Sequence, residues 1–166
     1  MGPILAMAHT LLAASGGLAA AAPSPAQGAR QAAVVTLPDD EKARQARQDW
    51  GYADAVLSGD TAYLSGVIAV MQEGEATPEA AYQRVFDRIG ERLGKIGCSW
   101  DDVVEMTTFH TDLDAQLPFI KAAMHKYLRP PFVAWTAVGV TRLAAPDGVT
   151  EIKVIARSCA APAGSQ

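Results

Sequence analysis

The chain has 166 residues, enough for one domain with a sizeable core once a terminal extension is set aside. Its 18 acidic and 14 basic residues give a formal net charge of -4, and no run of Lys or Arg offers a stripe for phosphates. The charge therefore argues against nucleic acid as the main partner, and the moderate proline and glycine content indicates a globular body rather than a disordered chain.

The N-terminal segment 1–29 contains no Asp, Glu, Lys or Arg, and residues 4–22 are apolar and rich in Ala and Leu. Small residues at Ser24 and Ala26 fit the minus-three and minus-one positions of a signal-peptidase site. We therefore expect 1–29 to be a signal peptide and the mature protein to be exported, either periplasmic or secreted. The lack of an N-terminal Lys or Arg leaves a disordered Ala-rich extension of a cytoplasmic protein as the alternative. Glycines and prolines make the segment a poor membrane span.

Residues 30–49 form a polar lead-in that we expect to be partly helical or loose. The folded body is expected over 50–158, followed by a tail at 159–166. Within the body, the turn sequence "SGD" separates two β-type runs, so we predict a hairpin of strands at about 52–57 and 61–69.

The segment 76–97 predicts a long helix. Thr77 suits the N-cap and Pro78 the first helical position. Gly90 and Gly94, one turn apart, predict close approach to a neighbouring backbone. The apolar stripe recurs at helical spacing: Ala81, Val85, Ile89, Leu93 and Ile96.

Ser99 is expected to cap a short turn that leads into a strand over 103–113. A second helix over 117–128, with Pro118 in its first turn, ends at "RPP" because a residue before proline avoids the helical region. Strands at 131–140 and 149–156 complete the order β-β-α-β-α-β-β. This order predicts an α+β fold, a mixed sheet with two helices on one face.

The last two strands predict an unusual outer face of the sheet. In 131–140 the alternation separates a face suited to the core, formed by Ala134, Thr136, Val138 and Val140, from a face that carries Trp135 and Ala137. In 149–156 we expect Ile152, Val154 and Ala156 to meet the helices, and Glu151, Lys153 and Ile155 to point outward together with Trp135 and Ala137. A face with Trp, Glu and Lys indicates a subunit interface that contains a ligand pocket.

Five segments resemble the Rid family, also called YjgF, in their order and spacing: "GYADAV", "AYLSG", "GCSWDDVVEMTTFHTDL", "PPFVAWTAVGV" and "EIKVIA". The best-known members are reactive-intermediate imine deaminases. The resemblance covers 50–157. It implies a chorismate-mutase-like fold and a homotrimer with small-molecule clefts between its subunits.

The resemblance also assigns candidate site residues. Tyr52 falls at the family's pocket tyrosine, Ser65 and Gly66 at its Ser-Gly strand end, and Glu151 at the acid credited with positioning water. The structural alternatives are hydroxyls satisfied by the backbone at Tyr52 and Ser65, and for Glu151 an ion pair with a nearby base, Lys153 or Arg142.

Two positions depart from the family pattern. Trp135 stands where deaminating members have the arginine that holds the substrate carboxylate, and Ala137 replaces a cysteine that is often present. Tryptophan offers a flat apolar face and one N–H instead of a charged fork. We therefore expect Trp135 to line the cleft and change what binds there. Plain interface packing is the alternative.

The other reactive side chains indicate no further chemistry. His110 is interpreted as a core or interface residue and His125 as solvated, and no His, Cys and Asp cluster has metal-ligand spacing, so we expect neither a metal nor a cofactor. Cys98 and Cys159 lack a C-x-x-C motif; we expect a buried thiol at Cys98, with a disulfide as the alternative in an exported protein.

Two functions follow from this pattern. The first is a hydrolase of imines, enamines or related reactive metabolites, in which Glu151 polarises water and Trp135 alters the substrate class. The second is a non-catalytic, exported small-molecule-binding protein that keeps the cleft. An RNA-cleaving or chaperone role finds no support in the charge or the motifs.

Overall fold

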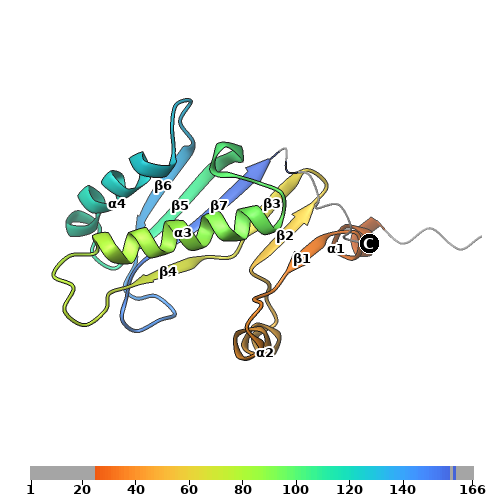
Figure 1. Cartoon of the computed structure of the whole chain (residues 1–166), viewed down its shortest axis with the longest axis horizontal. Helices are drawn as coiled ribbons and strands as arrows, with labels where there is room; N and C mark the ends of the chain where they lie inside the picture. The colour runs from red at the N-terminus through yellow and green to blue at the C-terminus, as the bar shows by residue number, and fades with distance from the viewer. Residues whose placement is uncertain (1–24, 158, 160–166) are drawn as a thin grey trace, which may run out of the picture.

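One mixed sheet carries the fold, and two long helices lie across the same face of it (Figure 1). The computed structural model describes residues 25–157 and 159, so the expected signal peptide falls almost wholly outside the described residues, as does most of the C-terminal tail. The strands are β1 (Val34–Thr36), β2 (Ala55–Ser58), β3 (Thr61–Leu64), β4 (Val67–Val70), β5 (Val103–His110), β6 (Ala134–Gly139) and β7 (Gly148–Arg157). The helices are α1 (Pro25–Gln31), α2 (Glu41–Trp50), α3 (Glu79–Lys95), the 3-10 turn η1 (Trp100–Asp102) and α4 (Leu113–Tyr127).

The strand order is β1-β2-β3-β7-β5-β6, and β4 also pairs with β7. Among the strands that the structure describes, β5 and β6 pair in parallel and the other pairs are antiparallel. The expected mixed sheet and the two covering helices of an α+β fold are confirmed. The lead-in, expected to be loose or partly helical, contributes both the edge strand β1 and the helix α2.

The predicted strand over 61–69 is two strands that pair with successive parts of β7. Thr61 lies opposite Arg157 in β3, whereas Val67 lies opposite Ile152 in β4. The chain bends between them at Ser65 and Gly66. The hairpin at "SGD" is confirmed, and Gly59 in its turn has a φ of 62°, which glycine adopts at little cost.

Two helix starts differ from the sequence prediction. Helix α4 begins four residues early, because the Asp112 side chain accepts a hydrogen bond from the Ala115 backbone N–H at 3.1 Å, and Pro118 lies inside the helix. Helix α3 begins at Glu79, and Thr77 bonds the Glu79 side chain instead of a free backbone N–H. The cap at Ser99 is confirmed, since Ser99 and Asp102 form a reciprocal capping box.

The core lies between the sheet and helices α3 and α4. The apolar stripe of α3 is buried as predicted, and it meets alternate residues of β7. Gly90 approaches a side chain rather than a backbone, because a Cβ there would lie 3.1 Å from Nε1 of Trp100. Gly94 faces open space, so its predicted close approach is wrong.

Cys98 and Cys159 form a disulfide, so the interpretation of Cys98 as an unpaired thiol is wrong. Their Cα atoms are 4.8 Å apart, inside the usual range of about 4.4–6.8 Å. Both residues are buried, and the bond ties the segment after β7 to the end of α3. The sequence offers this disulfide only as the alternative, because a 61-residue separation gives no local signal.

We expect reduction of this disulfide to lower the free energy of unfolding by roughly 4 kcal/mol, because cross-linking distant residues restricts the unfolded chain. Urea denaturation with and without reductant measures the change. The double variant Cys98→Ser and Cys159→Ser should show no response to reductant. Two titratable thiols in the oxidised, folded protein would contradict the prediction.

Candidate functional site

Glu151 lies near the middle of the sheet face that α3 and α4 leave uncovered. It is paired with Ile68 on β4 and with Phe109 on β5, and it is partly buried. Its carboxylate packs against Gly66, where a Cβ would lie 1.8 Å from Oε1. Only glycine leaves room for the carboxylate at this bend, so the sequence-predicted pair Gly66 and Glu151 do meet.

Ser65 and Tyr52 adjoin this bend. The Ser65 hydroxyl donates to the backbone carbonyl of Ala53 at 2.6 Å, which is the backbone-satisfied arrangement considered as the alternative for this residue. The Tyr52 ring is partly exposed, and the guanidinium of Arg47 lies 5.1 Å from its centroid. Four of the six candidate residues therefore belong to one region at the β3–β4 bend.

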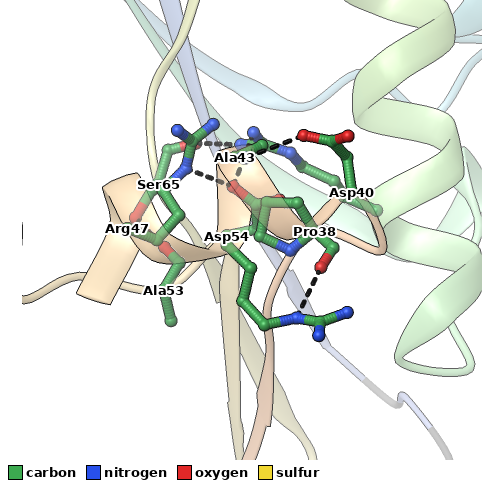
Figure 2. Close-up of polar contacts among 9 residues, drawn as sticks. Pro38, Asp40, Ala43, Arg47, Ala53, Asp54 and Ser65 are labelled. Atoms are coloured by element: carbon green, nitrogen blue, oxygen red, sulfur yellow. Dashed lines mark hydrogen bonds and ion pairs between the residues drawn. The ribbon is translucent and has the colours of Figure 1, made fainter. Parts of the chain in front are cut away.

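A buried ion cluster that the sequence analysis did not identify supports this region (Figure 2). Oδ1 of Asp54 lies 2.7 Å from Nη2 of Arg92 and 3.1 Å from Nε of Arg47. Arg92 also donates to the Ser65 carbonyl at 3.3 Å, and the Ser65 N–H donates to the Asp54 carbonyl at 3.0 Å. Burial lowers the pKa of Arg92, an effect that the nearby Asp54 carboxylate opposes. The cluster thus joins α2, α3 and the bend.

Trp135 is not on the face predicted for it. It pairs with Met106, which is buried beneath the helices, and its indole N–H donates to Oγ1 of buried Thr108 at 3.0 Å. Ala137 pairs with Thr108 and lies on the same side. The face that was expected to be core, formed by Ala134, Thr136 and Val138, is the exposed one.

The indole of Trp135 is held by a buried polar network. Thr108 Oγ1 lies 2.8 Å from Nε2 of His110, and the other His110 nitrogen, Nδ1, lies 3.2 Å from Oε1 of Gln116. Oγ1 of Thr150 also lies 3.1 Å from Nδ1 of His110, and it donates to Oε1 of Gln116 at 3.1 Å. With a neutral His110 protonated at Nδ1, Thr108 can donate to Nε2 while it accepts from Trp135, so each group has a partner. His110 is a core residue, as the sequence analysis expected.

This network predicts a pH dependence of stability. Burial lowers the pKa of His110 below its ordinary 6.5, although the hydrogen bond with Gln116 acts in the opposite direction. As the pH falls below about 6.5, the unfolded chain takes up a proton on this histidine and the folded chain does not. The free energy of unfolding should therefore decrease as the pH falls from 7.5 to 5.

Urea denaturation across this pH range tests the prediction with two variants. His110→Gln should flatten the pH dependence of the unfolding free energy. His125→Gln, a substitution of an exposed histidine, should keep the wild-type dependence. Equal slopes for wild type and His110→Gln would contradict a role for His110.

A groove of about 260 Å³ runs between α4 and β6, with Trp135 in its wall. Lys121 and His125 contribute the polar side chains, so His125 is exposed as expected but also borders a groove. The remaining lining is apolar: Met124, Leu128, Phe132, Val133 and Trp135. Trp135 is 37% exposed, and because its N–H is used by Thr108, it offers the groove mainly its ring.

The uncovered face of the sheet carries an apolar band. Tyr63 is 46% exposed although it lies in an interior strand of the sheet, and its neighbours Val56 and Ile155 share its face. Glu151 forms no ion pair with Lys153 or Arg142 within the residues described. An exposed apolar band on a sheet face is typical of a surface that associates with another chain.

Over residues 25–157 and 159, no group of three or more His, Cys, Asp or Glu side chains is arranged to hold a metal ion. In that same part of the chain, no helix is both long enough and apolar enough to cross a membrane.

The mixed sheet covered on one face by α3 and α4 defines a chorismate-mutase-like α+β protein of the YjgF type. The family model described as Endoribonuclease L-PSP matches residues 43–158, and the chain belongs to this family, also called YjgF or Rid. The family recognised from sequence segments is therefore confirmed.

Two relatives and one solved structure show which family members the chain is similar to. It is 40% identical over 111 residues to the RutC family protein YjgH of Escherichia coli, covering 64% of this chain and 82% of that protein. It is 32% identical over 98 residues to the 2-iminobutanoate/2-iminopropanoate deaminase of Dermatophagoides farinae, covering 55% of this chain and 74% of that one. A solved structure of protein YjgH aligns with a TM-score of 0.63 at 32% identity, covering 76% of this chain and 96% of that chain.

Proposed function

We propose that this protein is a hydrolase of imines, enamines or related reactive metabolites, with a small-molecule site formed between the subunits of a homotrimer. Its similarity to a 2-iminobutanoate/2-iminopropanoate deaminase supports the reaction class. The net charge of -4 disfavours the RNA substrate that the family description names.

The observation that carries the proposal is the placement of Glu151 and Trp135 on opposite faces of one sheet. A single subunit cannot bring a water held by Glu151 to a substrate that rests on Trp135. If a second copy packs its uncovered sheet face against the β6 edge of the first copy, the Glu151 of the second copy can face the Trp135 of the first. Closed cyclic assembly repeats this contact, and the exposed band around Tyr63 gives it apolar surface to bury.

The chemistry needs one acid–base group and one water. Water adds to the C=N carbon while the carboxylate of Glu151 takes one of its protons and delivers it to the nitrogen, which gives a carbinolamine. The same carboxylate then moves the hydroxyl proton to the amine and the C–N bond breaks, so that imine plus water yields a carbonyl compound plus ammonia. This carboxylate packs against Gly66 at the β3–β4 bend. No cofactor is needed to balance the reaction.

The substrate class is proposed to differ from that of arginine-bearing relatives. Trp135 and Ala137 provide neither a charged fork nor a thiol, and the indole N–H is already committed to Thr108. The same facts motivate the alternative function, a binding protein that has kept the cleft and lost the reaction. Ammonia release from a panel of imines distinguishes the two.

A subunit-mixing experiment tests the shared site. Glu151→Ala and Trp135→Ala homo-oligomers should each be impaired in ammonia release. Mixed oligomers of the two variants should regain activity, because one interface then pairs an intact Glu151 with an intact Trp135. Light scattering should give the mass of a trimer for the wild type. Mixed oligomers as inactive as their parents, or an active wild-type monomer, would overturn the proposal.

We further propose export to an oxidising compartment, which the Cys98–Cys159 disulfide supports. Intact-mass measurement on protein from its native compartment should show cleavage near residues 22–29. A full-length mass with reduced thiols would support the cytoplasmic alternative.

A further inference from the structure

We propose that the groove between α4 and β6 binds an aromatic or other bulky apolar carboxylate, and that Lys121 binds the carboxylate in place of the family's arginine. This inference rests on the proposed function in treating Trp135 as part of the substrate site, and it names the substrate class of that site.

Helix α4 turns one face toward the groove. Met124 and His125 lie three and four residues after Lys121, and the C-cap residue Leu128 lies four residues after Met124. These spacings place them on one side of the helix, and all four residues line the groove. The single lysine in this row lies beside Met124 and His125, so its charge is presented next to apolar surface. A lysine stem packs readily along such surface while the ammonium stays at the rim.

The wall of the groove opposite α4 indicates that the ligand contains a ring. Trp135 presents its ring because its N–H is bonded to Thr108, and Phe132 is 72% exposed beside it. A cavity of about 150 Å³ holds one benzene, and sites for larger ligands begin at about 300 Å³. The groove, at about 260 Å³, therefore fits a molecule with one or two rings.

The charge of the side chains that line the groove indicates that the ligand is an anion. Lys121 forms no ion pair or side-chain hydrogen bond with the residues that the structure describes, and no acidic side chain lines the groove. A cation, which a tryptophan face alone would attract, is repelled by Lys121. A single ammonium suits a monoanion such as a carboxylate. A small acid would meet Lys121 but leave the apolar walls uncovered.

Binding of phenylacetate and its neutral amide, phenylacetamide, tests the inference by titration calorimetry on the wild-type assembly. The acid should bind at least tenfold more tightly than the amide. Lys121→Met keeps the apolar stem and should bring the acid's affinity down to that of the amide. Lys126→Met, on the same helix but outside the groove lining, should leave the preference unchanged.

Equal affinities for acid and amide, or an unchanged preference in Lys121→Met, would overturn the role of Lys121, and no binding of either compound would overturn the site. These outcomes are independent of turnover. Hydrolysis of imines without an acid preference would leave the proposed function standing, and acid binding without hydrolysis would leave the site standing.

Discussion

The variant Asp54→Asn is expected to lose about 3 kcal/mol of unfolding free energy, close to the lower end of the loss seen when a buried ion pair is broken. Asp54 is the shared partner of Arg92 and Arg47, and Arg92 is buried. Asparagine preserves the shape and one acceptor oxygen but removes the charge. Arg92 is then left as a buried cation beside a second arginine.

Two further variants identify the cause of this loss. Asp60→Asn removes a carboxylate that pairs with Arg157 at 3.1 Å, but both side chains are more than half exposed, so its stability should change little. Adding Arg92→Met to Asp54→Asn removes the uncompensated charge and should restore part of the stability. Urea denaturation measures all three proteins. A double variant less stable than Asp54→Asn would show that Arg92 is not the source of the loss.

The loss should extend to the candidate site, because Arg92 and Asp54 also hold Ser65 through its backbone. Gly66 follows directly and contacts Glu151. We therefore expect Asp54→Asn to lower the activity of the folded protein as well as its stability. The ion cluster is a support for the site rather than part of its chemistry.

Most of the fold followed from local signals in the sequence. The "SGD" turn, the cap at Ser99 and the stripe on α3 each depend on neighbours a few residues away, and each predicted its element. Helix α4 begins earlier than the sequence predicts because Asp112 caps it, whereas the predicted strand over 103–113 includes this residue. The capping residue of α4 is present in the sequence, but the predicted helix starts at residue 117 instead of after Asp112.

The face of Trp135 could not be predicted from alternation. A period of two shows which residues of β6 share a face, but it does not show which face the helices cover. Small and β-branched residues at Ala134, Thr136 and Val138 suggested a core face, yet β6 is an edge strand and this side stays exposed. The large ring of Trp135 fills space under α4 instead.

The sequence contains a signal for the ion cluster, but hydrophobic periodicity alone does not identify it. Arg92 lies next to Leu93 and three residues after Ile89, within the buried stripe of α3, and Asp54 directly precedes an apolar strand. A charge on a core-facing stripe indicates a buried partner. Its partner is far away in the sequence, so only the folded chain identifies it.

The variant Trp135→Arg is expected to gain hydrolysis of 2-iminopropanoate, on which the wild type should show little activity. A guanidinium fork holds a carboxylate through two charge-assisted hydrogen bonds, each contributing roughly 1.5–3 kcal/mol. The catalytic efficiency should therefore rise by about two to four orders of magnitude. The small imino acid gains nothing from the apolar groove of the wild type, because it has no ring to place beside Trp135.

Matched variants separate the effect of the new positive charge at position 135 from the effect of removing the indole ring. Trp135→Gln also opens the groove and keeps a donor for Thr108, but it carries no charge and should give no gain. Glu151→Gln in the Trp135→Arg background should abolish the gain, since the amide cannot accept a proton from water. Wild-type turnover equal to that of an arginine-bearing relative would contradict the role of position 135. A gain that persists when Glu151→Gln is added would show that another residue is the acid–base group. It would contradict the proposed role of Glu151 on the uncovered sheet face.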